Sequence, residues 1–346
     1  MGKTVPSQPG RRSLQAIKGG SYTITLPRWW VTKHSMEKGA ELFVVEDGVS
    51  LKLAPTKLMG EKKKAEIHME SVDDVKSIRY LLWTYYMQGA DVMTVSSRKV
   101  MPVGTKKELR EVRLDLPGIE VAKEDGYSVT FEVTLGQEKK PLDTMIGEIQ
   151  EIALSIHRDA FAAVMKGDVD LAAEVIGREP EILRSYRAMI RKLAVCSVNS
   201  QEAYDSGIKD SRELITYGLL VRDLNRTVYH GIYIARHMKD LAQPIEEGIL
   251  RSLRRMSEAA YEMQRLSVEA FLNKDYSRVL KTLKLMELVK TIDGSIGAQI
   301  SKGTKNVKKA VAGMLIAREI RRIAGYSIGM ADAASNRIFF PSGESS

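Results

Sequence analysis

Arginines at a repeated spacing are the clearest chemical pattern in this sequence. The stretch VRDLNRTVYHGIYIA parallels AREIRRIAGYSIGMA further along the chain, and two arginines recur at a constant offset of 96 residues. Arg222 corresponds to Arg318, and Arg226 corresponds to Arg322. A guanidinium group matches the geometry of phosphate and carboxylate oxygens. The four arginines therefore indicate a groove for an anion or an acidic partner, with ordinary charge on solvent-exposed helix faces as the alternative.

Histidine and cysteine offer two further candidates for chemistry. His230 and His237 are seven residues apart, which places them on one face of a helix. With His157 they are candidates for a metal site, and a hydrogen-bonded or exposed histidine is the alternative. Cys196, the only cysteine, lies in an apolar run and is predicted to be a core residue. A single cysteine excludes an intramolecular disulfide and favours a reducing, cytoplasmic location.

No motif in the sequence points to catalysis. Neither a GxxxxGK[ST] nor a GxGxxG nucleotide loop occurs, and no nucleophile has a positioned base. We therefore predict that the protein is not an enzyme and holds no cofactor or metal. No run of 18 apolar residues occurs either, so no membrane insertion is expected.

The segment that must position these side chains, 138–340, is predicted to be helical almost throughout. Proline is rare in it and apolar residues recur at helical spacing. The expected helices cover about 140–166, 169–197, 208–241, 245–273, 275–300 and 305–339. An internal repeat supports a division in two, because D-A-F followed by Asp168 parallels E-A-F followed by Asp275, and each aspartate can cap a helix. We predict tandem three-helix bundles at 138–241 and 243–340.

The preceding segment, 65–135, alternates predicted strands and helices. Short strands, two helices and a closing hairpin are expected at 66–70, 73–88, 91–95, 106–116 and 119–135. This order predicts a small α/β domain.

The N-terminal segment, 11–55, contains the stretch KGGSYTITLPRWW. A double glycine indicates a turn, the polar–apolar alternation indicates a strand, and the proline suits the first turn of a helix. Four short strands and one short helix leave too little chain to bury a core alone. We therefore predict a swapped or shared sheet in a dimer, with Leu26, Trp29 and Trp30 in the dimer core.

Basic charge is concentrated in the first 64 residues. They carry 12 Lys and Arg and 5 Asp and Glu, which is +7 of the net charge of +9. This asymmetry is typical of a module that binds a polyanion, and a basic tail on a solvated surface is the alternative. The residues predicted to contact DNA are Arg11, Arg12, Lys18, Ser21, Arg28 and Lys33.

Two parts of the chain resemble known families. The K-G-G-S turn, the strand that runs into L-P-x-x-W, the K-G-A-E-L stretch and the D-G hairpin resemble an AbrB/SpoVT-type swapped-hairpin domain. The tandem bundles resemble PhoU, a regulator of phosphate signalling. The combination is similar to archaeal phosphate uptake regulators. The resemblance implies a multidomain, mainly α protein: a small swapped-hairpin β domain, a small α/β domain, then two tandem three-helix PhoU-like bundles.

The resemblance also implies a function. The expected protein is a homodimeric cytoplasmic regulator of phosphate uptake, whose basic head binds DNA. Its helical body senses or relays phosphate status through contacts with a phosphate transporter or sensor. The alternative is a signalling adaptor that does not bind DNA and uses its N-terminal domain only for dimerisation.

The sequence departs from PhoU where metal would bind. PhoU-type third helices carry an E-R-x-G-D-H-like motif, and carboxylates at such a spacing suit hard or iron-type cations. Asn225 and Tyr229 replace the acids in the first copy, and Arg321 and Gly325 replace them in the second. We therefore expect no PhoU-type metal cluster.

Overall fold

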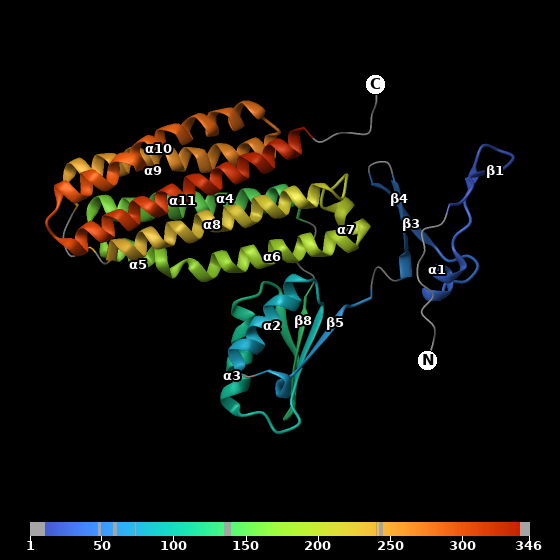
Figure 1. Cartoon of the computed structure of the whole chain (residues 1–346). Coiled ribbons are helices and arrows are strands. Elements are labelled where there is room, and N and C mark those ends of the chain that lie inside the picture. Colours follow the sequence, from blue (N-terminus) through green and yellow to red (C-terminus); the bar gives the residue numbers. More distant parts are fainter. Residues whose placement is uncertain are drawn as a thin grey trace. The chain divides into compact units, whose positions relative to one another are not determined.

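The chain forms two compact units, shown in the computed structural model of Figure 1. One unit comprises Met1–Glu46 and Ser50–Glu61, and the other comprises Asp47–Val49 and Lys62–Ser346. The structure describes residues 11–47, 50–57, 61–72, 74–134, 140–239, 241 and 245–339.

The first unit contains two short hairpins and one short helix. Strands β1 (Gln15–Ala16) and β2 (Tyr22–Thr23) pair in antiparallel fashion around a turn in which Gly19 and Gly20 have positive φ. Helix α1 (Arg28–Lys33) follows, and β3 (Leu42–Asp47) pairs with β4 (Ser50–Pro55). The first two strands are shorter than their alternation predicts, because each has only one neighbour and the ladder ends after two residue pairs.

No described residue of this first unit is buried. Several of its apolar side chains are exposed to solvent, including Leu14 (66% exposed), Tyr22 (68%) and Leu51 (70%). The described residues of the unit therefore form no hydrophobic core within a single chain, and we expect their fold to need apolar surface from outside the unit.

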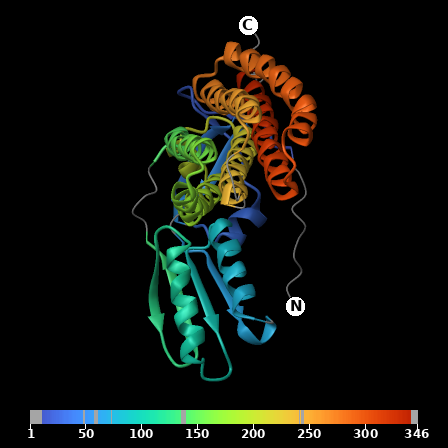
Figure 2. The ribbon, with the colours of Figure 1, turned by 90° about the vertical axis from the view of Figure 1, so that its left-hand side faces the viewer.

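The second unit begins with the predicted α/β domain. Its elements are β5 (Lys64–His68), α2 (Val75–Met87), β6 (Val92–Ser96), α3 (Val103–Glu111), β7 (Ile119–Glu124) and β8 (Ser128–Val133). The strand order is β5-β6-β8-β7, with β5 parallel to β6 and the other pairs antiparallel. Both helices cover the same face of the sheet (Figure 2). There Ile78 and Leu82 of α2 and Leu109 of α3 are buried with Met93 and Phe131 of the sheet.

The remainder of the second unit is helical. Its helices are α4 (Leu142–Lys166), α5 (Val169–Gly177), α6 (Glu179–Val198), α7 (Ser200–Asp205), α8 (Glu213–Lys239), α9 (Glu247–Asn273), α10 (Tyr276–Gly303) and α11 (Val307–Ile338). The helix expected at 169–197 is wrong in one respect, because it divides into α5 and α6 at Arg178. Pro180 lies in the first turn of α6, where its missing N–H and ring are tolerated, whereas a continuous helix would lose a hydrogen bond there.

The internal repeat reappears in the backbone. Helices α4 and α9 both end at a residue in the left-handed conformation, Gly167 (φ 67°) and Lys274 (φ 53°). The next residue caps the following helix in both copies: Asp168 accepts a hydrogen bond from the backbone N–H of Leu171, and Asp275 accepts one from Ser277. The two bundles share one hydrophobic core.

A buried arginine links the two bundles. Arg337, near the end of α11, is 8% exposed. Its Nη1 donates to Asp143 of α4 at 3.0 Å and to the carbonyl of Phe271 at 3.1 Å, and its Nη2 donates to Tyr217 of α8 at 2.8 Å. The guanidinium also lies over the rings of Tyr217 and Phe271. Four helices thus meet at one charged side chain.

Two arginines of α6 hold the α/β domain. Arg191 is 6% exposed and donates to the carbonyl of Ala90 at 2.6 Å and to the carboxylate of Asp91 at 2.7 Å. The Arg187 guanidinium lies 4.0 Å from the ring centroid of Trp83. Helix α6 therefore connects the α/β domain with α8, against which it also packs.

None of the described helices has a stretch long and apolar enough to cross a membrane.

Candidate functional site

The third helices of the two bundles, α8 and α11, pack directly on each other. Each presents a broad buried face, which includes Leu224 and Ile232 on α8 and Ile316 and Ile323 on α11. Apolar residues at helical spacing bury these faces. The stripe left exposed on each helix carries the arginines that the sequence singled out, so the α8–α11 pair is the place where the predicted chemistry can meet.

Each of these helices also buries one carboxylate. Asp223 is 4% exposed and Glu319 is 3% exposed. They occupy equivalent positions in the two copies of the repeat, each directly after a predicted arginine. Arg222 Nη2 contacts Asp223 at 2.9 Å, and Arg318 Nη2 contacts Glu319 at 3.0 Å. The repeat therefore builds the same charge pair twice, with the carboxylate buried and the guanidinium reaching solvent.

Glu319 has a second set of partners on α8. His230 Nδ1 donates to Glu319 Oε2 at 2.5 Å, and His237 Nε2 lies 3.8 Å from Oε1. The His230 ring stacks on Tyr326 with a centroid distance of 5.4 Å. Burial raises the pKa of Glu319, but hydrogen bonds from His230 and Arg318 outweigh it and leave the pKa below its ordinary value. Glu319 is therefore a buried carboxylate held in its ionised form.

The surroundings of Asp223 are tighter. A Cβ at Gly329 would lie 2.2 Å from Asp223 Oδ2, so a larger residue at this position of α11 would displace the carboxylate. Burial raises the pKa of nearby Asp332, and the negative charge of Asp223 raises it further. By the 96-residue offset, Tyr326 and Ala333 stand where His230 and His237 stand, so the second copy of the repeat has no histidine at either position.

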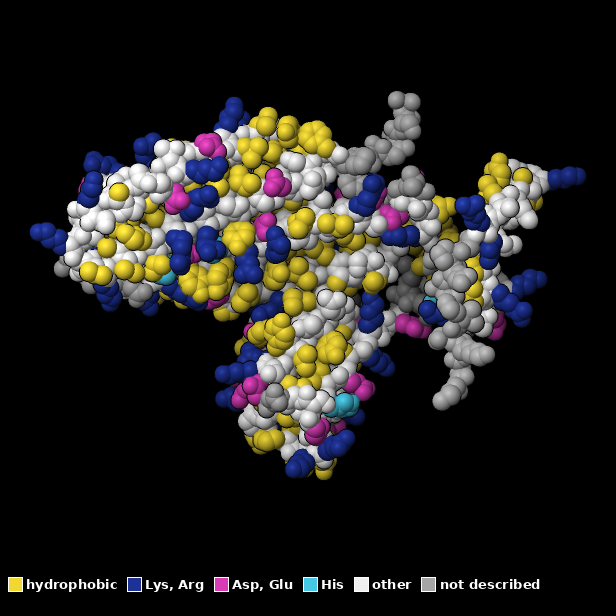
Figure 3. Space-filling model, in the orientation of Figure 1, with side chains coloured by type: hydrophobic (Ala, Val, Ile, Leu, Met, Phe, Trp, Pro, Cys, Tyr) yellow, Lys and Arg dark blue, Asp and Glu magenta, His cyan; other side chains and the backbone are white. Residues whose placement is uncertain are grey.

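The four predicted arginines are all exposed on this pair of helices. Arg222 and Arg318 pair with the buried carboxylates, while Arg226 and Arg322 make no ion pair with any residue that the structure describes. Exposed apolar side chains flank them. We define the seam face as these four arginines with Ile215, Leu219 and Tyr229 of α8 and Val311 and Met314 of α11. In Figure 3, Lys and Arg side chains are interspersed with hydrophobic ones over α8 and α11.

The histidines do not gather into one metal site. His157 bonds to Gln264 and Ser257 of α9, whereas His230 and His237 face Glu319. Across the described ranges, no three His, Cys, Asp or Glu side chains are arranged to hold a metal ion.

The two buried carboxylates are not among the residues predicted from the sequence. The acids of the PhoU-type motif are replaced at 225, 229, 321 and 325, and Asp223 and Glu319 lie just before those positions. The sequence does contain a signal for them, because an acid directly follows the arginine in both copies of the repeat, as Arg222-Asp223 and as Arg318-Glu319. Cys196 was correctly predicted as a core residue: it is 4% exposed, and burial raises its pKa.

His157 should make folding stability depend on pH. Burial lowers its pKa to about 4 in the folded protein, against about 6.5 in an unfolded chain. The unfolded chain therefore binds more protons between these two values, and falling pH favours unfolding. We expect a loss of about 2 kcal/mol from pH ~7 to pH ~5 through this residue. Urea unfolding across this range should show a smaller loss for His157→Gln, and an equal loss would contradict the prediction. His68→Gln, on exposed β5, is the matched control.

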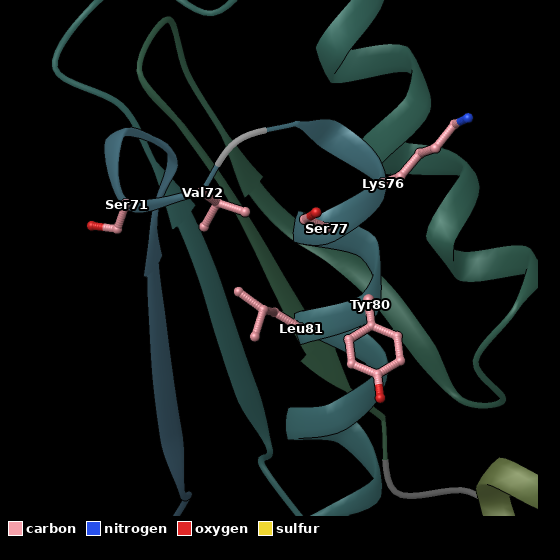
Figure 4. Close-up of a pocket in the computed structure, with 6 residues that line it drawn as sticks. All are labelled: Ser71, Val72, Lys76, Ser77, Tyr80 and Leu81. Atoms are coloured by element: carbon pink, nitrogen blue, oxygen red, sulfur yellow. The ribbon is translucent and has the colours of Figure 1, made fainter.

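A shallow hollow in the α/β domain does not form a comparable site. It has a volume of about 460 Å³ and is lined by Ser71, Val72, Lys76, Ser77, Tyr80 and Leu81. Figure 4 shows Ser71 and Lys76 pointing away from each other, so the polar groups do not converge on a ligand. The Asp74 carboxylate already accepts the hydrogen bond from Ser77 N–H at the start of α2, which disfavours an anion there.

The residues predicted to contact DNA all lie in the first unit and are exposed: Arg11, Arg12, Lys18, Ser21, Arg28 and Lys33. Within the described part of the chain, none of the basic ones pairs with an acid. Of the residues predicted for a dimer core, Trp29 is 36% exposed, while Leu26 and Trp30 are half-buried. Trp30 packs edge-on against His34.

Two helical bundles joined through α8 and α11 define a mainly helical class of protein. The PhoU domain model matches residues 146–238 and 253–334, which is half of the chain. The chain therefore belongs to the PhoU family. No curated protein matches it.

Two solved structures share the fold of this region. PhoU from Pseudomonas aeruginosa is 15% identical with a TM-score of 0.51, covering 57% of this chain and 95% of that one. The phosphate transport system regulatory protein PhoU from Streptococcus pneumoniae is 17% identical with a TM-score of 0.50, covering 59% of this chain and 96% of that one. Both matches span nearly the whole of those proteins and leave part of this chain uncovered.

Proposed function

We propose that this protein is a PhoU-type, non-enzymatic regulator of phosphate transport. The observation that carries the proposal is the paired-bundle body, which belongs to the PhoU family and resembles a protein described as a phosphate transport system regulator. The body senses or relays phosphate status through contacts with a transporter or sensor protein.

The seam face is the surface proposed for that contact. Arg226 and Arg322 are exposed without an ion pair to any described residue, and exposed Ile215 and Met314 lie on the same two helices. Guanidinium groups beside apolar side chains suit an acidic partner surface. The buried carboxylates Asp223 and Glu319 neutralise the other two arginines, which leaves two charges available.

The first unit is proposed to bind DNA as a homodimer. Two features support this: several of its apolar side chains are exposed in one chain, and the basic residues predicted to contact DNA pair with no described acid. A second copy would cover Trp29 and Trp30 and would double the basic surface. Most of these basic contacts would be made to phosphates, which set affinity and salt dependence.

Salt dependence of DNA binding tests this proposal. For the full chain, log K should fall linearly with log salt, by about 0.9 for each phosphate contact. Arg11→Ala with Arg12→Ala should weaken binding and reduce this slope by about 2 per protomer. Lys99→Ala with Lys107→Ala, which removes equal charge from the α/β domain, should change neither. Binding that is absent or insensitive to salt would exclude the DNA-binding role.

The alternative is an adaptor whose first unit serves only dimerisation. The same missing core supports it, because dimerisation alone would cover the exposed apolar side chains. A genome-wide DNA pull-down with phosphate supplied and withheld separates the two functions. A DNA-binding regulator should enrich defined sites in a phosphate-dependent way, whereas an adaptor should enrich none.

A further inference from the structure

The start of α10 presents an apolar, basic surface to solvent. Tyr276, Leu280 and Leu283 are 41%, 43% and 41% exposed, and they follow one another at helical spacing. Phe339 is 63% exposed and packs edge-on against Tyr276 at 4.8 Å. The neighbouring Lys281 and Lys284 are exposed, and neither pairs with a described acid. We call these residues the α10 face.

The equivalent helix of the first bundle has the opposite charge. When the two copies of the repeat are aligned in sequence at their capping residues, Asp168 and Asp275, α5 corresponds to the start of α10. The exposed residues of α5 are Val169, Asp170, Ala173, Glu174 and Gly177, and we call the first four of them the α5 face. No ion pair joins Asp170 or Glu174 to the part of the chain that the structure describes.

The two faces correspond directly at two positions, whereas Lys284 stands where Gly177 stands and Asp170 stands where Ser277 stands. Ala173 stands where Leu280 stands, and Glu174 stands where Lys281 stands. One face therefore offers large apolar side chains and free ammonium groups, and the other offers small apolar side chains and free carboxylates. Within one chain they cannot meet, because α10 and α5 lie along opposite edges of the helical body (Figure 1).

We propose that the α10 face of one chain docks on the α5 face of a second copy. The interface is heterologous, because two different surfaces meet. It therefore joins chains head to tail, and the assembly has one free α10 face at one end and one free α5 face at the other. It extends the dimer proposed for the first unit into larger assemblies. Because each face is small, the contact is weak, and because its charges are exposed, it weakens further with salt.

Charge reversal tests the pairing directly. Sedimentation velocity of the full chain over about a hundredfold concentration range should show growth of larger species at low salt and their loss at high salt. Lys281→Glu with Lys284→Glu should abolish that growth, and so should Asp170→Lys with Glu174→Lys. Mixing these two variants should restore it, because each then supplies the face that the other lacks.

The matched control reverses the same charge elsewhere. Lys302→Glu with Lys308→Glu, on exposed positions outside the α10 face, should leave the concentration-dependent growth unchanged. A parent chain that does not grow with concentration would overturn the proposal, as would charge-reversed variants that assemble like the parent. Mixed variants that stay apart would overturn it too, and would point to an acidic segment of another protein as the occupant of the α10 face.

Discussion

Replacing Arg337 with alanine is expected to lower the free energy of unfolding of the helical body by about 3 kcal/mol. The guanidinium is almost fully buried and bonds to Asp143, Tyr217 and the carbonyl of Phe271. Removing it leaves these acceptors without their donor and leaves a cavity between the bundles. This loss of unfolding free energy is at the low end of the range for breaking a buried ion pair, because the Asp143 side chain is 43% exposed. Urea unfolding followed by far-ultraviolet circular dichroism measures the change.

Arg158, an arginine on α4, supplies the control. Arg158 pairs with Asp159, but its side chain is 64% exposed, so Arg158→Ala should cost no more than about 1 kcal/mol. If Arg337→Ala and Arg158→Ala lowered the free energy of unfolding equally, burial of the arginine would not explain the loss. Tyr217→Phe gives a further check, because it removes one of the hydrogen bonds of Arg337 without a large change in volume. It should cost about 1 kcal/mol.

The sequence predicts those features of the fold that are determined by residues close to one another along the chain. The aspartates at 168 and 275 were recognised as helix caps because a cap acts within three residues of itself. The Gly19–Gly20 turn was equally local. The division at Arg178 was missed because Pro180 is compatible both with the start of a new helix and with the end of the previous one.

Long-range charge pairs could not be predicted in the same way. Arg337 and Asp143 are separated by 194 positions, and no periodicity relates them. At the seam, the offset of the repeat identified Arg222 and Arg318, but it could not show that the following acids are buried. Burial of Asp223 and Glu319 depends on how α8 packs on α11, which hydrophobic spacing alone does not determine.

Glu319→Ala is expected to destabilise the helical body by about 3 kcal/mol. The carboxylate is 3% exposed and is the shared partner of His230, His237 and Arg318. Without it, the buried His230 imidazole loses its acceptor, and the cost of burying that ring is no longer offset. Urea unfolding near pH ~7 should show the loss, and Glu287→Ala, on the exposed side of α10, should change stability by less than about 0.5 kcal/mol.

A double-mutant cycle separates the charge pair from the space it fills. If the His230–Glu319 contact causes the loss, then His230→Leu with Glu319→Leu should cost less than the sum of the two single changes, since both polar groups leave together. Glu319→Gln keeps the shape and one acceptor, so it should lie between the parent and Glu319→Ala. Additive effects would instead mean that Glu319 acts mainly through Arg318. Because Arg318 belongs to the seam face, the cycle also shows whether the proposed partner surface and the packing of the two bundles depend on the same carboxylate.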